Sequence, residues 1–501
     1  MGNRGFILVV SLVFCVLCGI ATADLIFADP PAKHDNFWTL GEMNKASIIM
    51  LKERGIIPKD LAAKIARAIE QVNTAGNKPG AERPSDYLRV EAALADVGGP
   101  EVSRVHSGRS RQDMMSVTQR MFLRESLLDT VEHLNKMRER LLVLAANHRD
   151  TIIPAYTHGV QSQPTTLAHY LLAWVQSFDR DAERFRQTYA RINLSPMGAA
   201  AGVTSSFQID RMRLAELLGF EGIVENSLDA NFLSPAQTNT DYASDLAMSA
   251  LAIGMLAQDI HVQYHQPYPW FMLKEGPLTG ISSIMPQKRN PSALENVRML
   301  ASHVISGAHA TYIQAHNTTI GMNDDRSSLD ARTTANDAQS MYDLLGKILD
   351  GLIIDRERAL AEVNADYSTT SELADKLQQV ANVPFRTGHH FASELTNYGR
   401  ANKLKPDDIP YNEAASIYQR ETGQVMPLTE KQFRDALSAS HMISASKGIG
   451  GPQPSEVNRM LVNARKRLGD DGDWIKKRKA KLLDAEANLQ RQFSDLAGTA
   501  Q

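Results

Sequence analysis

The chain has 501 residues, of which 43% are hydrophobic and 22% are charged, and its formal net charge at pH 7 is -3. This length allows two or three domains or one large multi-part fold, and the composition is ordinary for a soluble globular protein. The weakly negative charge gives no reason to expect a nucleic-acid partner.

The N-terminus has the pattern of a cleaved secretory signal over residues 1–23. Arg4 precedes an apolar stretch over residues 6–20 and a small-residue end, Ala-Thr-Ala, which closes at Ala23. This apolar stretch is shorter than the roughly 20 residues that a membrane-spanning helix needs. We therefore expect cleavage near Ala23 and a secreted or periplasmic protein that begins at Asp24, with no membrane partner after cleavage. A retained anchor is the alternative.

Both cysteines of the chain, Cys15 and Cys18, lie inside this signal. The mature chain would therefore have no disulfide, no cysteine nucleophile and no thiolate metal ligand. A lipid anchor at Cys18 is disfavoured, because Leu17 stands where that cleavage prefers a small residue. No group of histidine and acidic residues has metal-ligand spacing either, so the sequence predicts no metal.

Most of the mature chain has helical rather than strand periodicity, and breakers divide it into three predicted parts. Short helices over residues 24–115, separated by Asn-Lys-Pro-Gly and Gly-Gly-Pro runs, form an N-terminal helical domain. Long helices over residues 116–356 form a central helical bundle domain. Shorter segments over residues 357–501 form a C-terminal helical domain. The predicted fold class is therefore mostly α.

The central part carries the clearest helical signals. One long helix is indicated by apolar residues that recur every three or four positions: Leu127, Val131, Leu134, Met137, Leu141 and Leu144. The segment from Tyr242 to Tyr264 is apolar nearly all round, which is typical of a helix in the middle of a bundle or at a subunit interface. Helical periodicity also covers roughly 165–190 and 294–315. The basic run at 476–479 fits the solvated face of a terminal helix.

The stretch from Gly280 to Pro291 carries the most chemistry. It reads Gly-Ile-Ser-Ser-Ile-Met-Pro-Gln-Lys-Arg-Asn-Pro, and its glycine and prolines favour a shaped loop over regular helix or strand. Asn290 and Pro291 predict the N-cap and first residue of a helix, followed by an apolar stripe over residues 293–300. A cation and unpaired backbone N–H groups at a helix start favour an anion such as a carboxylate. A capped loop with a solvated Lys-Arg pair is the alternative.

This stretch resembles the signature loop of the aspartase/fumarase superfamily, whose usual form is Gly-Ser-Ser-x-Met-Pro-x-Lys-x-Asn-Pro. Ile281 stands where the family usually has the first glycine, with Gly280 just before it. Further segments, in the expected order, resemble the argininosuccinate lyase branch of that superfamily: residues 105–113 (Val-His-Ser-Gly-Arg-Ser-Arg-Gln-Asp), 154–164 (Pro-Ala-Tyr-Thr-His-Gly-Val-Gln-Ser-Gln-Pro), 195–198 with 226–230 (Ser-Pro-Met-Gly and Asn-Ser-Leu-Asp-Ala), and 383–386 with 389–390 (Val-Pro-Phe-Arg and His-His). Together they extend over most of residues 100–460.

The resemblance implies a mostly α-helical, three-part fold of the aspartase/fumarase type with a long central helical bundle. It also implies a homotetramer that packs these bundles into a twenty-helix core, with active sites that combine segments of three chains. No cofactor is implied, because protein groups stabilise the carbanion. The implied activity is that of a carbon–nitrogen lyase, which eliminates an amine from an N-substituted aspartate and releases fumarate.

Such an elimination needs a base, a holder for the developing charge and an acid for the departing nitrogen. By position in the family's motifs, the base is Ser283, the second serine of the pair, which requires a loop that closes because a serine hydroxyl is a weak base. His158 is the matching histidine, oriented by Glu295, and whether it donates the proton or only holds charge stays open. The implied substrate-binding residues are Ser110, Arg111, Gln112, Thr157, Gln163, Lys288 and Asn290.

Two segments depart from the branch's pattern. The segment that contacts the arginine end of the substrate has no clear counterpart at residues 321–328, and the Ala-His-x-x-Met-Leu motif is replaced at residues 45–51 by a run without histidine. The half of the site for the succinyl group is thus preserved and the half for the amine is not. The substrate is then argininosuccinate or a different N-succinyl amine, such as an aminopolycarboxylate of the ethylenediamine-disuccinate type. A non-catalytic exported ligand-binding or structural protein is a third possibility, against which the retained Ser283 and Lys288 argue.

Overall fold

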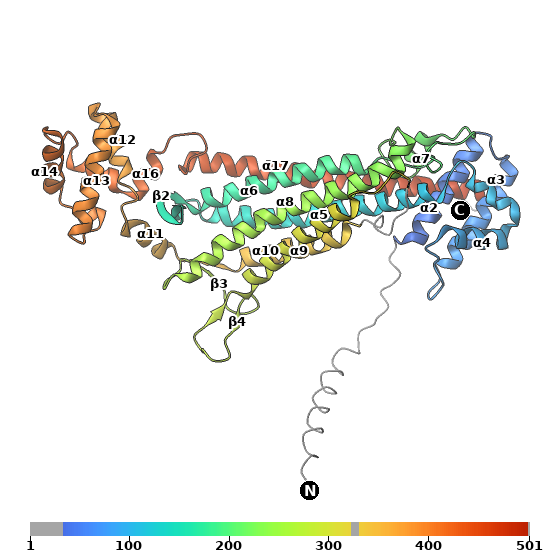
Figure 1. Ribbon diagram of the computed structural model, residues 1–501, viewed down its shortest axis with the longest axis horizontal. Coiled ribbons are helices and arrows are strands. Elements are labelled where there is room, and N and C mark those ends of the chain that lie inside the picture. The colour runs from blue at the N-terminus through green and yellow to red at the C-terminus, as the bar shows by residue number, and fades with distance from the viewer. Residues whose placement is uncertain (1–33, 322–329, 499–501) are drawn as a thin grey trace, which may run out of the picture. The chain divides into compact units, whose positions relative to one another are not determined.

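The computed structural model describes residues 34–321 and 330–498. The predicted signal over residues 1–23 and nearly all of the segment 321–328 lie outside these ranges. Helices dominate the described chain (Figure 1), which confirms the predicted mostly α-helical class. Over those ranges, no helix is both long and apolar enough to cross a membrane.

Contacts group the chain into two compact units that are each drawn from separate stretches. Unit 1 consists of the chain up to Phe122, Ser195–Asn231 and the chain from Asp484 onward, and unit 2 consists of Leu123–Leu194 and Phe232–Leu483. Two long helices, α5 (Arg111–Asn147) and α17 (Pro454–Ala497), contribute residues to both units. The three consecutive domains remain a prediction of the sequence.

Unit 1 is built from short helices. They are, in chain order, α2 (Asn36–Glu53), α3 (Lys59–Gly76), α4 (Tyr87–Gly98), the 3-10 helix η1 (Pro100–His106), the first turns of α5, α7 (Arg211–Leu217), the first residues of the short π-helix η2 (Asp229–Leu233) and the end of α17. The predicted break at the Gly-Gly-Pro run is confirmed. Gly99 has φ 79°, a backbone conformation that favours glycine, and η1 begins at Pro100.

α2 is the core helix of unit 1, because every residue from Thr39 to Leu51 is buried. Its polar groups therefore find partners inside the protein. Lys45 Nζ donates to Glu42 Oε1 and to Gln490 Oε1, each at 2.7 Å. Burial raises the pKa of Glu42 even though the ammonium of Lys45 opposes this shift. The run without the family's histidine, residues 45–51, is thus part of the core.

Unit 2 contains the longest helices and short antiparallel strand pairs. Its helices are the remainder of α5, α6 (Leu167–Ile192), α8 (Ser234–Val262), η3 (Gln263–His265), α9 (Ser292–Ala315), α10 (Arg332–Asp350), α11 (Arg356–Ala365), α12 (Ser371–Ala381), α13 (Phe385–Ala401), η5 (Pro406–Asp408), α14 (Tyr411–Thr422), α15 (Glu430–Leu437), α16 (Ala439–Ala445) and most of α17. The strand pairs are β1 (Ile152–Thr157) with β2 (Val160–Thr166), β3 (Phe271–Leu273) with β6 (Leu352–Ile354), and β4 (Gly280–Ile281) with β5 (Arg289–Asn290).

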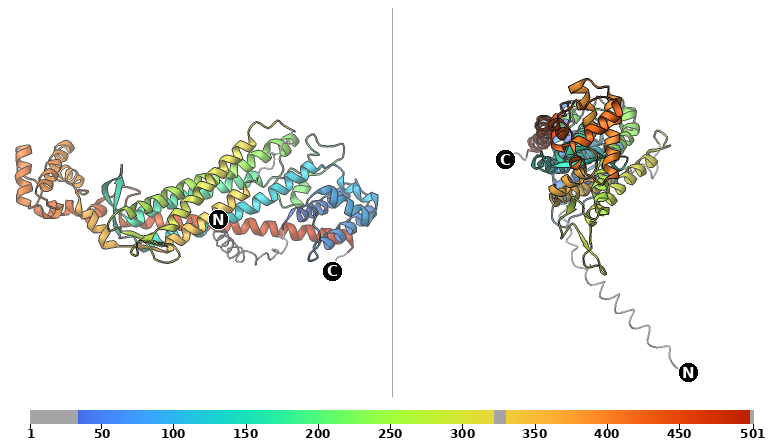
Figure 2. Two further views of the ribbon diagram at one scale, coloured as in Figure 1. Left: turned by 60° about the horizontal axis from the view of Figure 1, so that its bottom comes forward. Right: turned by 90° about the vertical axis from the view of Figure 1, so that its left-hand side faces the viewer.

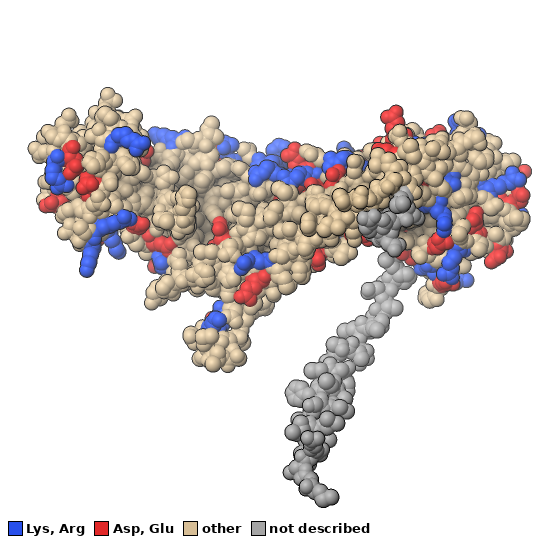
Figure 3. All heavy atoms as spheres, viewed as in Figure 1, with Lys and Arg blue, Asp and Glu red and all other residues tan. Residues whose placement is uncertain are grey.

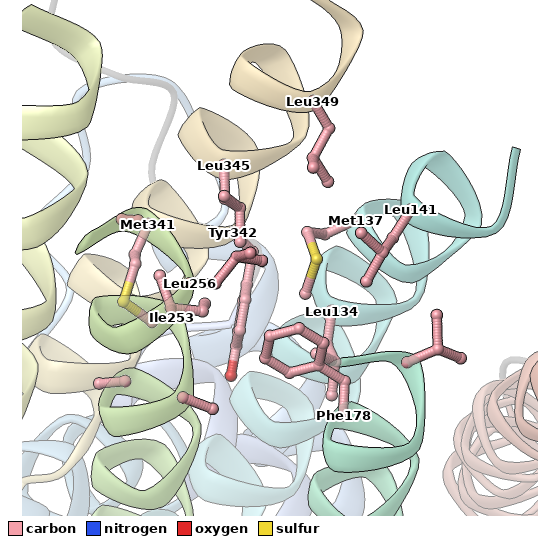
Figure 4. Packing of buried hydrophobic residues seen from close by; sticks show 14 of the residues in the cluster. Leu134, Met137, Leu141, Phe178, Ile253, Leu256, Met341, Tyr342, Leu345 and Leu349 are labelled. Carbon is pink, nitrogen blue, oxygen red and sulfur yellow. The ribbon is translucent and has the colours of Figure 1, made fainter. Parts of the chain in front are cut away.

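The long helices of unit 2 run alongside one another (Figures 1 and 2) and bury their apolar faces in one core. The predicted stripe on α5 is confirmed, since its residues from Leu127 to Leu141 are buried and Leu144 is partly buried. Figure 4 shows these α5 side chains beside Phe178 of α6 and Tyr342 of α10. Truncating one such side chain to alanine costs about 2–5 kcal/mol, so this core fixes the segments that extend from the bundle.

α8 has a second apolar face in addition to the buried one. Leu246, Ile253 and Leu256 lie in the core, as predicted for a bundle helix. A further stripe at helical spacing is 45–62% exposed: Met248, Leu251, Met255 and Val262. An exposed apolar stripe of this kind is typical of an interaction surface.

Two further predicted features of unit 2 are the short C-terminal helices and the basic run on α17. The small helices α12 to α15 form their own core around Phe391, Tyr418 and Phe433. The basic run at 476–479 lies on α17, where Lys476 is solvated and Lys479 Nζ bonds Asp129 at 2.8 Å and Glu132 at 3.0 Å. The prediction of a solvated helix face is therefore confirmed for Lys476 and Lys477, whereas Arg478 and Lys479 are half-buried.

Candidate active site

The first predicted site segment lies at the start of α5, in unit 1. Ser110 and Asp113 cap this helix reciprocally, because the Asp113 N–H donates to Ser110 Oγ at 3.4 Å and Ser110 Oγ donates to Asp113 Oδ1 at 3.2 Å. Arg111 and Gln112 are its first residues, where free N–H groups and the helix dipole favour an anion. The half-exposed guanidinium of Arg111 pairs with Asp86 Oδ2 at 3.4 Å. This segment therefore offers a carboxylate both a helix start and a cation.

Asp113 was quoted in the sequence motif but given no role, and the structure shows what it does. Its buried carboxylate accepts from the N–H groups of Ala200 at 2.9 Å and Ala201 at 3.0 Å, and from Asn231 Nδ2 at 2.8 Å. Ala200 and Ala201 have φ 48° and 68°, which is strained for residues with a side chain. Asp113 thus fixes a strained loop beside the start of α5. Its spacing from Ser110, as in a capping box, is the sequence signal that could have revealed it.

Arg109, directly before Ser110, fixes the same segment through buried hydrogen bonds. It is buried, donating from Nη1 to Ser47 Oγ at 2.9 Å and from Nη2 to Asn44 Oδ1 at 2.6 Å and Tyr87 OH at 3.0 Å. Ser47 stands where the Ala-His-x-x-Met-Leu motif has its histidine. The replacement therefore serves core packing in this chain.

His106 is half-buried and packs against the same Tyr87. Its ring stacks on Tyr87 with 4.9 Å between ring centroids. Burial, followed by the charge of Arg109, lowers the pKa of His106 to about 4. The imidazole is therefore neutral near pH 7, and its Nδ1 has no hydrogen-bond partner among the described residues.

The second segment is the tip of the β1–β2 hairpin in unit 2. Thr157 pairs with Val160 across the turn, and His158 and Gly159 have φ 53° and 76°. Two successive positive φ angles are the mark of a type I′ hairpin turn. For His158 this conformation is uncommon and is a form of strain that gathers at functional sites. Thr157, His158 and Gln163 are exposed.

The hairpin is fixed beneath its tip by α11. The Tyr156 hydroxyl donates to the Glu362 carboxylate, and Gln161 Nε2 donates to the Val363 carbonyl at 3.1 Å. These contacts were not predicted. The position of Tyr156, directly before the Thr-His pair, was the available signal.

The third segment is the signature loop, which projects from unit 2 between β4 and β5 and carries basic side chains (Figures 1 and 3). Gly280 pairs with Asn290 and Ile281 with Arg289. A Cβ on Gly280 would lie 2.6 Å from Ser292 Oγ, so the base of the loop excludes a side chain there. This explains a glycine at position 280, and Ile281 is 80% exposed.

The two serines of the loop differ in their bonds. Ser282 Oγ accepts from the N–H groups of Ile284 at 3.4 Å and Met285 at 3.1 Å, which closes a turn. Ser283 is exposed, and its side chain has no hydrogen bond to any residue in the described ranges. The second serine is therefore the one whose hydroxyl is available for chemistry.

The predicted N-cap at Asn290 is wrong by one residue. α9 begins at Ser292 with Pro291 as its N-cap, and no side chain caps it. The reason is that the Asn290 backbone is used in the strand pair with Gly280. The apolar stripe of α9 is confirmed, with Leu300 at its partly buried edge.

Lys288, in the signature loop, and Glu295, on the helix that follows it, are both exposed. Glu295 lies in the first turn of α9, and its charge acts on His261, whose pKa is lowered by burial and by Arg298. The described chain shows no hydrogen bond between Glu295 and His158, so this pairing stays a prediction.

One chain therefore presents the predicted residues on separate exposed segments. Ser283, Lys288, Asn290 and Glu295 belong to the loop and the helix that follows it. Thr157, His158 and Gln163 belong to the hairpin, which lies elsewhere in unit 2 (Figure 1), and Ser110, Arg111 and Gln112 belong to unit 1. Within the described part of unit 2, no hydrogen bond or ion pair joins the loop group to the hairpin group.

The sequence of this chain is similar to those of known proteins. The family model described as Lyase matches residues 51–306, and the one described as Argininosuccinate lyase C-terminal matches residues 367–444. Argininosuccinate lyase 1 of Shouchella clausii (strain KSM-K16) is 31% identical over 493 residues, which is 95% of this chain and 97% of the relative. The argininosuccinate lyase of Methanothrix thermoacetophila is 32% identical over 449 residues, 89% of this chain and 91% of the relative.

Solved structures agree. The crystal structure of an EDDS lyase in complex with formate matches with a TM-score of 0.83 at 28% identity, over 93% of this chain and 92% of that chain. The fumarate lyase from Mesorhizobium sp. BNC1 shares the fold, with a TM-score of 0.66 at 18% identity over 86% and 96% of the two chains.

The fold and the signature loop define a lyase of the aspartase/fumarase type. The chain belongs to the argininosuccinate lyase branch of that superfamily. It is a carbon–nitrogen lyase that releases fumarate, which confirms the enzyme class predicted from the motifs.

Proposed function

We propose that this lyase cleaves an N-substituted aspartate whose amine half need not be arginine. Ser283 takes the proton from the carbon beside the succinyl carboxylate. The electron pair of the broken carbon–hydrogen bond forms the double bond of fumarate as the carbon–nitrogen bond breaks. The electron pair of the carbon–nitrogen bond stays with the nitrogen, which is protonated as the amine leaves. Lys288 stabilises the doubly charged carboxylate in between.

The observation that carries this proposal is the contrast between the two serines. Ser282 is occupied by backbone N–H groups of its own turn, whereas Ser283 is exposed and free of such bonds within the described chain. A serine base requires a free hydroxyl and a nearby positive charge to activate it. Lys288 is exposed in the same loop.

The remaining predicted residues are suited to carboxylates and amide-like groups. Arg111 provides a bidentate fork at a helix start, with Ser110 and Gln112 on either side. Gln112 Nε2 reaches the Asn231 carbonyl at 3.4 Å, so the longer amide in place of the usual asparagine is directed back at its own unit. Thr157 and Gln163 would supply further donors from the hairpin.

The amine half is the open part of the specificity. Ser47 replaces the family's histidine and is used inside the core by Arg109. Relatives include both argininosuccinate lyases and an EDDS lyase, so argininosuccinate and an ethylenediamine-disuccinate (EDDS) are both candidate substrates.

The test is fumarate release, followed by its ultraviolet absorbance, from argininosuccinate and EDDS with the protein that begins at Asp24. We expect turnover of at least one N-succinyl amine and little turnover of aspartate itself. EDDS turned over faster than argininosuccinate would support the altered amine half. Strict selectivity for argininosuccinate would contradict it.

We also propose a homotetramer with shared active sites. The supporting observations are the exposed apolar stripe on α8 and the scatter of the site residues over separate exposed segments of one chain. Light scattering after gel filtration should give four chains. Leu251→Glu, at the centre of the stripe, should then yield smaller species without fumarate release, because incomplete sites would remain.

Export is the third proposal. It rests on the basic start, the apolar stretch and the small-residue end of residues 1–23. N-terminal sequencing of the protein from the periplasmic or secreted fraction should begin near Asp24. A chain that retains Arg4 would contradict cleavage.

A further inference from the structure

The hairpin that carries His158 cannot hold its shape alone. An isolated two-stranded hairpin is marginally stable in water. Here the tip also contains a histidine at φ 53°, and Thr157 to Val160 are all exposed. The geometry of the tip must therefore be set by contacts lower in the hairpin.

Tyr156 provides the main contact. The register of the hairpin shifts between Pro154 and Tyr156, where Ser162 and Gln163 of β2 lie opposite the single residue Ala155 of β1. Directly after this irregularity, the Tyr156 hydroxyl donates to Glu362 on α11. Burial, followed by the Glu362 carboxylate, raises the pKa of Tyr156, so the phenol remains a protonated donor at neutral pH.

Glu362 is itself fixed from the other side. Its side chain is only 14% exposed, and Oε2 pairs with Arg358 Nη2 at 3.1 Å. Gln266 Nε2 approaches Oε1 at 3.5 Å, and Arg358 Nε donates to the Tyr268 carbonyl at 2.9 Å. The acceptor for Tyr156 thus belongs to a charged cluster that does not depend on the hairpin.

We infer that Glu362 is a positioning residue for the reaction, which sets the hairpin tip, and with it Thr157 and His158, through the Tyr156 hydroxyl. The bond acts one residue before the Thr-His pair, so a shift at Tyr156 passes directly to the tip. Displacing a catalytic group by about 1 Å can cost about 100-fold in rate. The inference rests on the proposed lyase function and on the catalytic place that the family's motif implies for His158.

The experiment compares Tyr156→Phe, Glu362→Leu and Glu362→Gln on the N-succinyl amine that the wild type cleaves fastest. Tyr170→Phe is the matched control, because Tyr170 OH on α6 also donates to a carboxylate, Asp259 Oδ2 on α8 at 2.9 Å, and neither residue belongs to the hairpin or to α11. The measurements are kcat, KM and Tm.

We expect Tyr156→Phe and Glu362→Leu each to lower kcat about 10- to 100-fold, with little change in KM or Tm. Their double variant should be no worse than Glu362→Leu alone, because that change already removes the bond to Tyr156. Glu362→Gln should recover most of the activity, since its amide oxygen still accepts. In a His158→Asn background, Tyr156→Phe should cost little more.

Wild-type kcat in the Tyr156→Phe and Glu362→Leu variants would overturn the inference. So would losses that follow Tm and occur equally in Tyr170→Phe, since that is the result of a purely structural bond. Failure of the proposed substrate is distinguishable from failure of this inference. Wild-type turnover tests the first, and the ratio of variant to wild-type kcat tests the second.

Discussion

The start of α5 and the signature loop both present residues for a carboxylate, but their supports differ. At α5, Arg109 and Asp113 are buried, and their hydrogen bonds reach α2, a strained loop and η2. The signature loop is held at its base by two strand residue pairs and by the ion pair of Arg289 with Glu275, and the turn around Ser282 lies within the loop itself. We propose that the buried polar contacts preorganise the start of α5 to bind a carboxylate, and that the exposed loop allows Ser283 to close onto a substrate.

Removing the cation of the loop tests the catalytic side of this contrast. Lys288→Met should lower kcat about 100- to 1,000-fold, the usual cost of losing one group that stabilises transition-state charge. Tm should stay unchanged, because Lys288 is exposed. Lys476→Met, a change at another solvated lysine, is the control. A Tm loss in Lys288→Met would show that the loop is a structural element.

Removing the anchor at α5 should instead appear in stability. Asp113→Ala leaves the N–H groups of Ala200 and Ala201 without an acceptor and removes one of the two acceptors of Asn231 Nδ2, which keeps the Ala201 carbonyl. Each buried unpaired group costs about 1–3 kcal/mol, so we expect the free energy of unfolding to fall by about 2–5 kcal/mol. Urea denaturation measures it, and Asp113→Asn should lose less. Unchanged stability would show that the loop at 200–201 keeps its conformation without Asp113.

The base of the signature loop should be sensitive to one added methyl group. In Gly280→Ala the new Cβ would meet Ser292 Oγ at 2.6 Å. Overpacking of this kind costs about 1–3 kcal/mol and should displace the loop. A second change, Ser292→Ala, removes the clashing atom and should restore both Tm and kcat. If the double variant stays impaired, the clash is not the cause.

The smallest expected effect is a dependence of stability on pH that arises from His106. The pKa of His106 is about 4 in the folded protein and 6.5 without burial. As pH falls below 6.5 the unfolded chain binds a proton that the folded chain does not, so stability declines from pH 6.5 toward pH 4. Tm of His106→Gln should fall less steeply over that window. Parallel curves for variant and wild type would contradict the assignment.

The sequence correctly predicted the helical class and the α5 stripe, because these depend on local periodicity, and its contiguous motifs identified the family. The roles of the three site segments stay predictions. The sequence analysis missed Asp113 and Tyr156, whose partners Ala200 and Glu362 lie 87 and 206 residues away. It also misplaced the start of α9, since local N-cap chemistry at Asn290 gave way to a strand pair across the loop. Long-range pairing is what local patterns do not contain.

The most direct test of the account compares Ser283→Ala with Ser282→Ala in fumarate release from the best N-succinyl substrate. Loss of a general base costs about 100- to 10,000-fold, so we expect kcat of Ser283→Ala to fall by that factor with Tm unchanged. Ser282→Ala, which only opens the turn, should retain most of its activity. If Ser282→Ala is the inactive variant and Ser283→Ala is not, the assignment of the free second serine as the base is wrong.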